Sequence, residues 1–365
     1  MGQAVGQQSV EEQSGEFVER MFESLVGAVN LFSIDLGRRL GLYEALAPGP
    51  ATSGELAERA GCDERYVREW LEHQAVVGVI EPDEPAAGDH ERRYSIPDAH
   101  RESLLDPDSL LFVGGLAYAA TALARPVEWL VEAFRTGDGV PYSRYGREGV
   151  EVQDALTRPA FARLLTTEWV PALPELEARL LEAPAARVAD IACGVGRAAI
   201  ALAQRYPEIT VDGFDFDESS IDLARKHAAE AGVADRVRFE SKDASDASIT
   251  GEYDLITIFE AVHDMSRPVA VLAAARRLLA PEGWLIVADE KTGDSFAEPG
   301  PFDGFLYGVS VLWCLPQSRS EQPSEAIGAA IRSSKVESLA QSAGFSKTEI
   351  APIEYDFWRF YRLIP

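Results

Sequence analysis

The alternation of strand-like and helix-like segments after Arg187 is the feature that most limits how this chain can fold. Short apolar runs, typical of buried strands, alternate with segments whose apolar residues recur at helical spacing. Strands are expected at 187–192, 210–214, 237–241, 253–259, 284–289, 347–353 and 357–363, and helices at 197–205, 219–231, 268–279 and 334–343. This order predicts an α/β fold with a doubly wound, mostly parallel sheet of seven strands. Ligands bind such sheets at the carboxyl ends of the strands.

The first hundred residues carry a different pattern, in which helices come first and two short strands follow. A capping box formed by Thr52 and Glu55 predicts one helix start, and Asp63 predicts another. Helices are expected at 17–47, 52–60 and 63–77, and strands at 79–80 and 94–96. Three helices followed by a two-stranded wing predict a mainly helical winged-helix domain.

These patterns divide the chain into four segments. Residues 1–15 are polar and are expected to be a disordered tail, and 16–105 form the winged-helix domain. Residues 106–180 are expected to be a helical linker and substrate lid, with helices at 110–134 and 159–181 around a turn-rich stretch at 137–142. The sheet domain is expected to span 181–365.

The charge of the chain narrows the range of partners. Sixty acidic residues stand against 34 basic ones, which gives a formal net charge of −26. Such a surface repels nucleic-acid phosphates and anionic membranes, so neither is an expected partner. The sequence contains neither a signal-peptide pattern nor an apolar run long enough to span a bilayer, which favours a cytoplasmic protein. The three cysteines are far apart, so no disulfide framework or metal site is expected.

The ends of the first four predicted strands carry a candidate cofactor site. The first strand runs into Asp190-Ile191-Ala192-Cys193-Gly194-Val195-Gly196, where glycines allow the backbone to approach a ligand. Asp215 ends the second strand, where an acid can accept hydrogen bonds from both ribose hydroxyls. Asp243 follows the third strand and Phe259 ends the fourth. Nicotinamide enzymes share part of this pattern but prefer a third glycine where Ala199 stands.

Together these residues resemble the class I S-adenosylmethionine-dependent methyltransferases, which have a Rossmann-like sheet, over residues 185–365. The resemblance implies S-adenosylmethionine as cofactor and S-adenosylhomocysteine as product. It also assigns cofactor contacts by position, to Asp190, Ala192, Gly194, Gly196, Asp215, Phe216, Asp243, Ala244 and the carbonyl of Phe259. Ala192 departs from the usual pattern, which has glycine there.

The tract after the fourth strand carries the candidate chemistry. His263 lies just past the carboxyl edge of the sheet, and imidazole suits a general base near neutral pH. The pair His263-Asp264 resembles that of small-molecule O-methyltransferases, in which the histidine takes the proton of a hydroxyl. Glu290, after the next strand, matches the carboxylate that orients the histidine in those enzymes. Asp264 is expected to be a structural partner, and His263 as a mere helix cap is the alternative.

Aromatic side chains are expected over the strand ends, where they could form an apolar pocket for a small-molecule acceptor. The candidates are Tyr142, Tyr145, Trp169, Phe302, Phe305, Tyr307 and Trp313, with ordinary core packing as the alternative for each. Cys193 and Cys314 are expected to be small packing residues.

The winged-helix segment raises the alternative of a transcriptional regulator. Over residues 16–365 the chain also resembles a bacterial subgroup whose members are labelled either methyltransferases or regulators. The candidate recognition helix at 63–72 holds four acids against two arginines, whereas a DNA-reading helix is basic. In the O-methyltransferases the same module builds a homodimer, which is the role expected here. A regulator that senses S-adenosylmethionine, and a methyltransferase acting on nitrogen or sulfur without a base, remain the alternatives.

Overall fold

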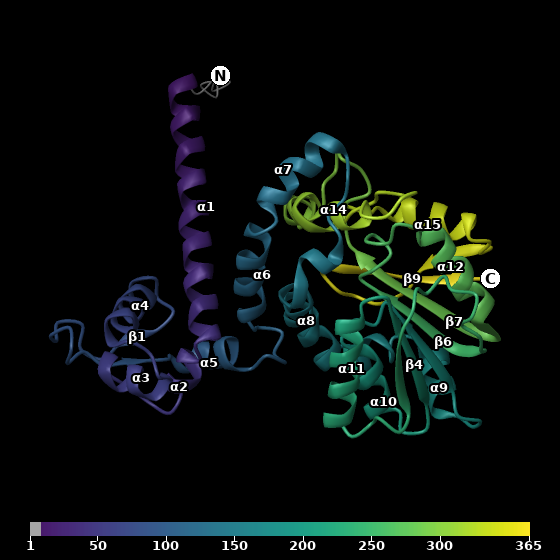
Figure 1. The fold of residues 1–365 in the computed structure, drawn as a ribbon, viewed down its shortest axis with the longest axis horizontal. Coiled ribbons are helices and arrows are strands. Elements are labelled where there is room, and N and C mark those ends of the chain that lie inside the picture. Colours follow the sequence, from purple (N-terminus) through teal and green to yellow (C-terminus); the bar gives the residue numbers. More distant parts are fainter. Residues whose placement is uncertain (1–8) are drawn as a thin grey trace, which may run out of the picture. The chain divides into compact units, whose positions relative to one another are not determined.

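The computed structural model describes residues 9–365, which form two compact units, 9–121 and 122–365 (Figure 1). Each unit has a hydrophobic core of its own. The division falls inside helix α6 (Gly114–Ala124).

The N-terminal unit is mainly helical and carries a two-stranded wing between its fourth and fifth helices. Its elements are α1 (Val10–Arg39), α2 (Leu42–Leu46), α3 (Ser53–Ala60), α4 (Glu64–Val76), β1 (Glu81–Pro82), β2 (Tyr94–Ser95) and α5 (Asp98–Leu105). The predicted capping box of Thr52 and Glu55 is confirmed. Helix α1 approaches α4 so closely that a Cβ on Gly37 would lie 2.4 Å from the Trp70 ring. The Trp70 indole N–H also donates to the Ser33 carbonyl of α1, at 2.9 Å.

Three predictions for this unit are wrong in detail. Helix α1 begins at Val10, because Ser9 and Glu12 form a capping box, so residues 10–15 are not a disordered tail. Residues 1–8 lie outside the described residues. The helix expected over 17–47 breaks at Gly41, whose φ of +66° ends one helix and begins the next. The first wing strand lies at Glu81–Pro82 rather than at 79–80.

The C-terminal unit is built on a seven-stranded sheet. Its strands are β3 (Arg187–Ile191), β4 (Thr210–Asp215), β5 (Val237–Ser241), β6 (Tyr253–Phe259), β7 (Leu279–Glu290), β8 (Lys347–Ile350) and β9 (Trp358–Ile364). The order across the sheet is β5-β4-β3-β6-β7-β9-β8, and β9 runs opposite to the other six strands. The predicted α/β sheet is therefore confirmed, and the strand order reverses between β3 and β6.

Helices cover both faces of this sheet, as the two buried clusters require. The connecting helices are α10 (Arg197–Arg205), α11 (Glu218–Glu230), α12 (Pro268–Leu278) and α15 (Ser333–Ser342). Helices α10 and α11 pack with one cluster, and α12 and α15 pack with the other (Figure 1). Neighbouring residues of β3 alternate between them, with Val188 in the first cluster and Ala189 in the second.

The predicted linker over 106–180 does not form a separate unit. Its first part belongs to the N-terminal unit, where Ala117 joins the core, and the remainder belongs to the sheet unit. The sheet unit contains α7 (Val127–Thr136), η1 (Tyr142–Arg144), α8 (Gly146–Arg163), η2 (Leu165–Trp169) and α9 (Pro174–Leu181) before the sheet, and α13 (Asp303–Val309), η3 (Ser310–Cys314) and α14 (Leu315–Ser318) within it. Segments η2 and η3 are single π-helical turns.

None of the helices in the described part of the chain is both long and apolar enough to cross a membrane.

The core of the N-terminal unit supplies a direct stability test. Leu71 of α4 is fully buried, so Leu71→Ala is expected to lower the free energy of unfolding of that unit by about 2–5 kcal/mol. Val76→Ala is the matched control, because Val76 lies in the same helix and is 86% exposed. Scanning calorimetry should show a lower transition temperature for the Leu71 variant only. Equal transition temperatures for the two variants would contradict this account of the core.

Candidate functional site

A cavity of about 720 Å³ lies at the carboxyl ends of β3, β4 and β6, where the strand order reverses. This is the position at which doubly wound sheets bind ligands. The residues that follow β3 and β6, Ala192 and Glu260, both line the cavity and both have positive φ, at +55° and +51°. Residues other than glycine rarely adopt this backbone conformation, and those that do often lie at functional sites.

The turn after β3 brings backbone amides to the cavity. Ala192 and Gly194, both expected to contact the cofactor, line it, and Gly194 has a φ of +50°. Gly196 does not line the cavity. It caps α10 with a φ of +81°, and a Cβ there would meet the Phe239 ring at 2.5 Å. Gly196 therefore permits the close packing of β5 under the turn, so that its part in a cofactor site is indirect.

Two carboxylates stand beside this turn. Asp215 accepts from the amides of Gly194 and Asp217, each at 2.9 Å, and burial raises its pKa to about 6. Asp190 accepts from the Thr257 hydroxyl at 2.7 Å, whereas its other oxygen, Oδ2, has no hydrogen-bond partner among residues 9–365. Burial raises the pKa of Asp190 to about 7. Burial of a carboxylate costs free energy. Both acids line the cavity, so a ligand that donates hydrogen bonds to them can reduce this cost.

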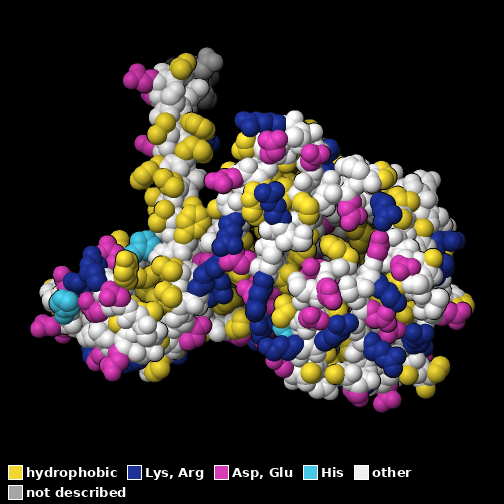
Figure 2. Space-filling view, in the orientation of Figure 1, with side chains coloured by type: hydrophobic (Ala, Val, Ile, Leu, Met, Phe, Trp, Pro, Cys, Tyr) yellow, Lys and Arg dark blue, Asp and Glu magenta, His cyan; other side chains and the backbone are white. Residues whose placement is uncertain are grey.

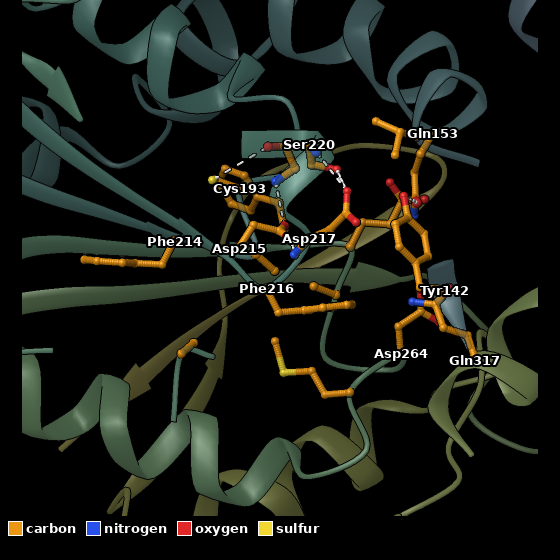
Figure 3. Close-up of a pocket in the computed structure, with 18 of the residues that line it drawn as sticks. Tyr142, Gln153, Cys193, Phe214, Asp215, Phe216, Asp217, Ser220, Asp264 and Gln317 are labelled. Carbon is orange, nitrogen blue, oxygen red and sulfur yellow. Dashed lines mark hydrogen bonds between the residues drawn. The ribbon is translucent and has the colours of Figure 1, made fainter. Parts of the chain in front are cut away.

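Phe216, Asp243 and Ala244, also expected to contact the cofactor, form the next part of the wall. The Asp243 carboxylate is held by Ser245 and by Arg267, whose guanidinium lies 3.0 Å away. Tyr142 reaches the cavity from the opposite wall, and its ring lies edge-on to that of Phe216 with centroids 6.1 Å apart. Figure 3 shows Phe216 between the group formed by Asp215, Asp217 and Ser220 and the group formed by Tyr142, Asp264 and Gln317.

Helix α8 supplies a wall that the sequence analysis missed. Gln153, Thr157 and Phe161 line the cavity at helical spacing. Asp154 of the same helix binds Arg197, the first residue of α10, through two contacts of 2.7 Å. Because proline usually marks the first turn of a helix, the sequence pattern predicted a helix start at Pro159 and did not predict this face. The helix begins at Gly146 and includes that proline.

The far end of the wall holds a buried group of side chains that we call the His263 cluster: His263, Asp264, Asp289 and Cys314. His263 is 1% exposed, and its Nδ1 lies 2.5 Å from Asp289 Oδ1. Its Nε2 lies 3.3 Å from Asp264 Oδ1. Burial lowers the pKa of His263, but Asp264 and Asp289 more than offset this and hold it well above its usual range.

Only Asp264 of this cluster lines the cavity, so His263 stands one side chain behind the wall. Cys314 belongs to the cluster, with its thiol within hydrogen-bonding reach of His263 and Asp264. The expectation that Cys314 merely packs is thus incomplete. Asp264, expected to be a structural partner, is the member that faces a ligand.

Glu290 is not the residue that orients His263, and that prediction is wrong. The carboxylate on His263 belongs to Asp289, one residue earlier. Neighbouring side chains of a strand point to opposite faces, so these two acids of β7 cannot share one partner. Glu290 lies instead near Glu260: burial raises the pKa of Glu260 to about 8, and burial together with Glu260 raises that of Glu290.

Most of the predicted pocket aromatics do not line the cavity; Tyr142 does. Trp169 is core, packed against Trp358 and Phe360. Tyr145 and Trp313 are buried against each other, with ring centroids 4.0 Å apart. The other candidates lie on or beside α13, where Phe305 and Tyr307 are partly exposed and Phe302 stacks on Phe357. The spacing of aromatic residues in the sequence does not reveal which way each side chain points, and these rings do not line the cavity.

Comparison with known proteins agrees with this geometry. Residues 182–344 match a family described as a methyltransferase domain, and residues 27–105 match one described as an Rv2258c-like winged HTH domain. Residues 182–344 are thus a methyltransferase domain, and the relatives of this chain are S-adenosylmethionine-dependent methyltransferases. The methyltransferase domain carries the cavity, and the winged-helix domain is the mainly helical N-terminal unit.

Individual proteins match only part of this chain. The ubiquinone biosynthesis O-methyltransferase of Bordetella avium (strain 197N) is 27% identical over 194 residues, which are 53% of this chain and 73% of that protein. Against other proteins of that description the chain spans between 42 and 66% of their length.

Two solved structures share the fold over almost the whole chain. The mitomycin 7-O-methyltransferase MmcR has a TM-score of 0.67 at 20% identity, covering 97% of this chain and 99% of that one. PigF with SAH has a TM-score of 0.69 at 18% identity, covering 98 and 100%. At such identities the likeness concerns the fold alone.

The cavity fits S-adenosylmethionine on its own chemistry. Its volume is in the range of small-molecule sites. When the cofactor is bound, Asp215 would hold the ribose hydroxyls, and the turned backbone of Ala192 beside Asp190 would meet the amino-acid end. Phe216 and Asp243 remain for the adenine. When bound, the cofactor supplies an electrophilic methyl group on a sulfonium.

Asp215 is expected to control cofactor binding. Asp215→Asn should weaken binding of S-adenosylmethionine about 10–100-fold, because hydrogen bonds to a charged acceptor are lost. The carboxylate is ionised above its pKa of about 6, so wild-type affinity should fall as pH drops below 6. Calorimetric titration measures both effects.

The matched control for this titration is Asp222→Asn, an exposed acid of α11. Wild-type affinity in Asp215→Asn, with folding verified by circular dichroism, would contradict the assignment. So would an affinity that stays constant from pH 8 to pH 5.

Proposed function

We propose that this methyltransferase transfers the methyl group of S-adenosylmethionine to a hydroxyl oxygen of a small molecule. The supporting observation is the position of the His263 cluster, whose Asp264 carboxylate stands on the wall of the cavity that fits the cofactor. The C–S bond of the sulfonium breaks as the C–O bond forms. The electron pair stays on sulfur, and S-adenosylhomocysteine leaves. The hydroxyl proton needs an acceptor at that moment.

The proton acceptor in this proposal is Asp264, with His263 as its positioning residue. This modifies the expectation that His263 itself touches the substrate, because His263 is buried behind the wall. Asp289 fixes the imidazole through Nδ1, so that Nε2 faces Asp264. A carboxylate held by a histidine in a site shielded from water can take a proton without first being reoriented.

The acceptor itself contacts the wall made by α8 and α14. Thr157 and Phe161 offer a hydroxyl and an apolar ring, and Gln317 has a buried Oε1 without a hydrogen-bond partner among the described residues. An acceptor with a donor group opposite Gln317 and a flat apolar body fits these side chains. Hydroxylated aromatic molecules have this chemistry.

A radiolabelled methyl-transfer assay over a panel of phenols and aliphatic alcohols tests the proposal. His263→Ala is expected to lower kcat about 10²–10⁴-fold on an active acceptor, with cofactor affinity kept, because general-base catalysis contributes that much. His90→Ala is the matched control, since His90 is exposed in the N-terminal unit. An unchanged kcat in His263→Ala would show that His263 does not position Asp264. An unchanged kcat in Asp264→Asn would remove the proton acceptor and favour transfer to nitrogen or sulfur.

We also propose that the N-terminal unit is a dimer element rather than a DNA reader. The arginines of α4 are paired with acids, Arg65 with Glu69 and Arg68 with Glu64, which leaves little positive charge for phosphates. A cytoplasmic location and small-molecule metabolism complete this proposal, with no nucleic-acid or membrane partner.

The dimer surface in this proposal is the apolar side of α1. Large apolar side chains on it are exposed along most of its length: Phe17, Val18, Met21, Phe22, Leu25, Val26, Val29, Phe32 and Leu36. Figure 2 shows apolar side chains gathered along this helix. Exposed apolar surfaces of this size mark interaction sites, and a second copy of the chain presents a self-complementary one.

Leu25→Glu is therefore expected to convert a dimer into a monomer. Two charges would have to be buried in a symmetric interface, which costs more than the lost apolar contact. Light scattering coupled to size exclusion measures the mass. Glu23→Gln, elsewhere on the same helix, is the control and should leave the mass unchanged. A wild-type monomer, or a Leu25 variant that stays dimeric, would contradict the proposal.

A further inference from the structure

The His263 cluster has the arrangement of a metal site as well as that of a proton acceptor. His263, Asp264 and Cys314 each offer one ligand atom, and these three atoms lie within 4.8 Å of one another. Nitrogen, carboxylate oxygen and thiolate sulfur are the ligand types of Zn²⁺. Tetrahedral zinc sites hold such atoms roughly 3.3–3.8 Å apart. The 3.3 Å between His263 Nε2 and Asp264 Oδ1 agrees with that spacing.

The surroundings of His263 supply an independent observation. Its Nδ1 is bound by Asp289, which is fully buried, so Nε2 is the nitrogen left for a ligand. Metal-binding histidines almost always hold a carboxylate or carbonyl through their other ring nitrogen, because this fixes the ring and its tautomer. The backbone amide of His263 also donates to Asp289, at 3.3 Å, which orients that carboxylate from a second side.

Asp264 is the unsatisfied member of the cluster. Its side chain is 9% exposed, and its Oδ1 is buried without a hydrogen-bond partner in the described part of the chain. The charge that faces this oxygen is that of the protonated His263 ring, whose Nε2 lies 3.3 Å away, and a divalent ion can take the place of that proton. Oδ1 is also the oxygen that faces His263 Nε2, so a cation between them would satisfy both atoms.

The chain fixes these three residues from both sides. Cys314 ends the π-helical turn η3, and such turns recur at functional sites. The amide of Gly328 donates to the His263 carbonyl at 3.1 Å, and the Ser266 hydroxyl donates to the Ser318 carbonyl at 2.8 Å. The turn that carries His263 and Asp264 is thus tied to the segment that carries Cys314.

We propose that His263, Asp264 and Cys314 bind one divalent ion of the Zn²⁺ class, with an open coordination position on the cavity side. Three protein ligands and an open position are the pattern of catalytic rather than structural zinc sites. The opening faces the cavity because Asp264 is the ligand that lines it. Binding removes the thiol proton of Cys314 and the Nε2 proton of His263, and both protons pass to solvent.

The role of the ion rests on the proposed function, whereas its binding does not. A hydroxyl at the open position would be polarised by the ion and would lose its proton more readily. Asp264 binds through Oδ1, which leaves Oδ2 to take that proton. The acceptor class is thereby narrowed to hydroxyl compounds that can coordinate the ion. This departs from the expectation of metal-free chemistry, which rested on the wide separation of the three cysteines in the sequence.

Cobalt substitution of the full chain tests the site without reference to activity. After chelation and dialysis, one equivalent of Co²⁺ is expected to produce a near-ultraviolet thiolate-to-metal absorption band, and Zn²⁺ should abolish it by competition. Cys314→Ser should remove the band and weaken binding at least 100-fold. Asp289→Asn, which alters only the partner of His263, should weaken binding about 10–100-fold.

Cys62→Ser is the matched control and should keep the band, because Cys62 lies in the N-terminal unit. Circular dichroism shows whether each variant folds, and Asp264→Asn serves if Cys314→Ser does not. Absence of stoichiometric Co²⁺ binding by the folded wild type would overturn the proposal. A band that persists in both Cys314→Ser and Asp264→Asn would also overturn it. Cofactor titration of the same samples reports separately on the methyltransferase site.

Discussion

The junction of β3 and β6 is the constraint on which the rest of the site depends. At this junction the strand order reverses, and Asp190 pairs in register with Thr257, whose hydroxyl also binds its carboxylate. Just beyond, both strands turn through a residue with positive φ, Ala192 on one side and Glu260 on the other. The two turns separate the chain segments and open the cavity between them.

Buried charge is concentrated around that opening. Asp190 and Asp215 stand beside the cofactor end, and Glu260, Asp264, Asp289 and Glu290 stand near the other end. Burial of so many acids costs stability in the free protein, and the cost is repaid only when donors or cations meet them. A sulfonium cofactor at one end and a divalent ion at the other would each reduce this cost. The same carboxylates therefore connect the two ligands with the stability of the fold.

Sequence patterns predicted the sheet domain well because its signals are local. Helix α10 was expected at 197–205 and lies there, since a glycine turn precedes it and an apolar face continues through it. Strands β5 and β6 also match their expected ranges. Asp215, Asp243 and Phe259 line one cavity, because parallel strands bring their carboxyl ends to one edge.

The rest of the site depends on the directions in which side chains point, and local sequence patterns do not determine these directions. One step along β7 separates Asp289, which holds His263, from Glu290, which was expected to hold it. Pro159 suggested a helix start, although α8 runs through it and presents Gln153 and Thr157 to the cavity. Cys314 reaches His263 only after the chain folds, so that spacing in sequence could not reveal their contact.

A crystal structure of the full chain with S-adenosylhomocysteine tests the central claim most directly. The account predicts density for the ligand along the turn after β3, with the ribose hydroxyls on Asp215, the amino-acid end beside Asp190 and the adenine between Phe216 and Asp243. The sulfur should point along the cavity toward Asp264. A ligand bound elsewhere, or one whose sulfur points away from the His263 cluster, would contradict the account.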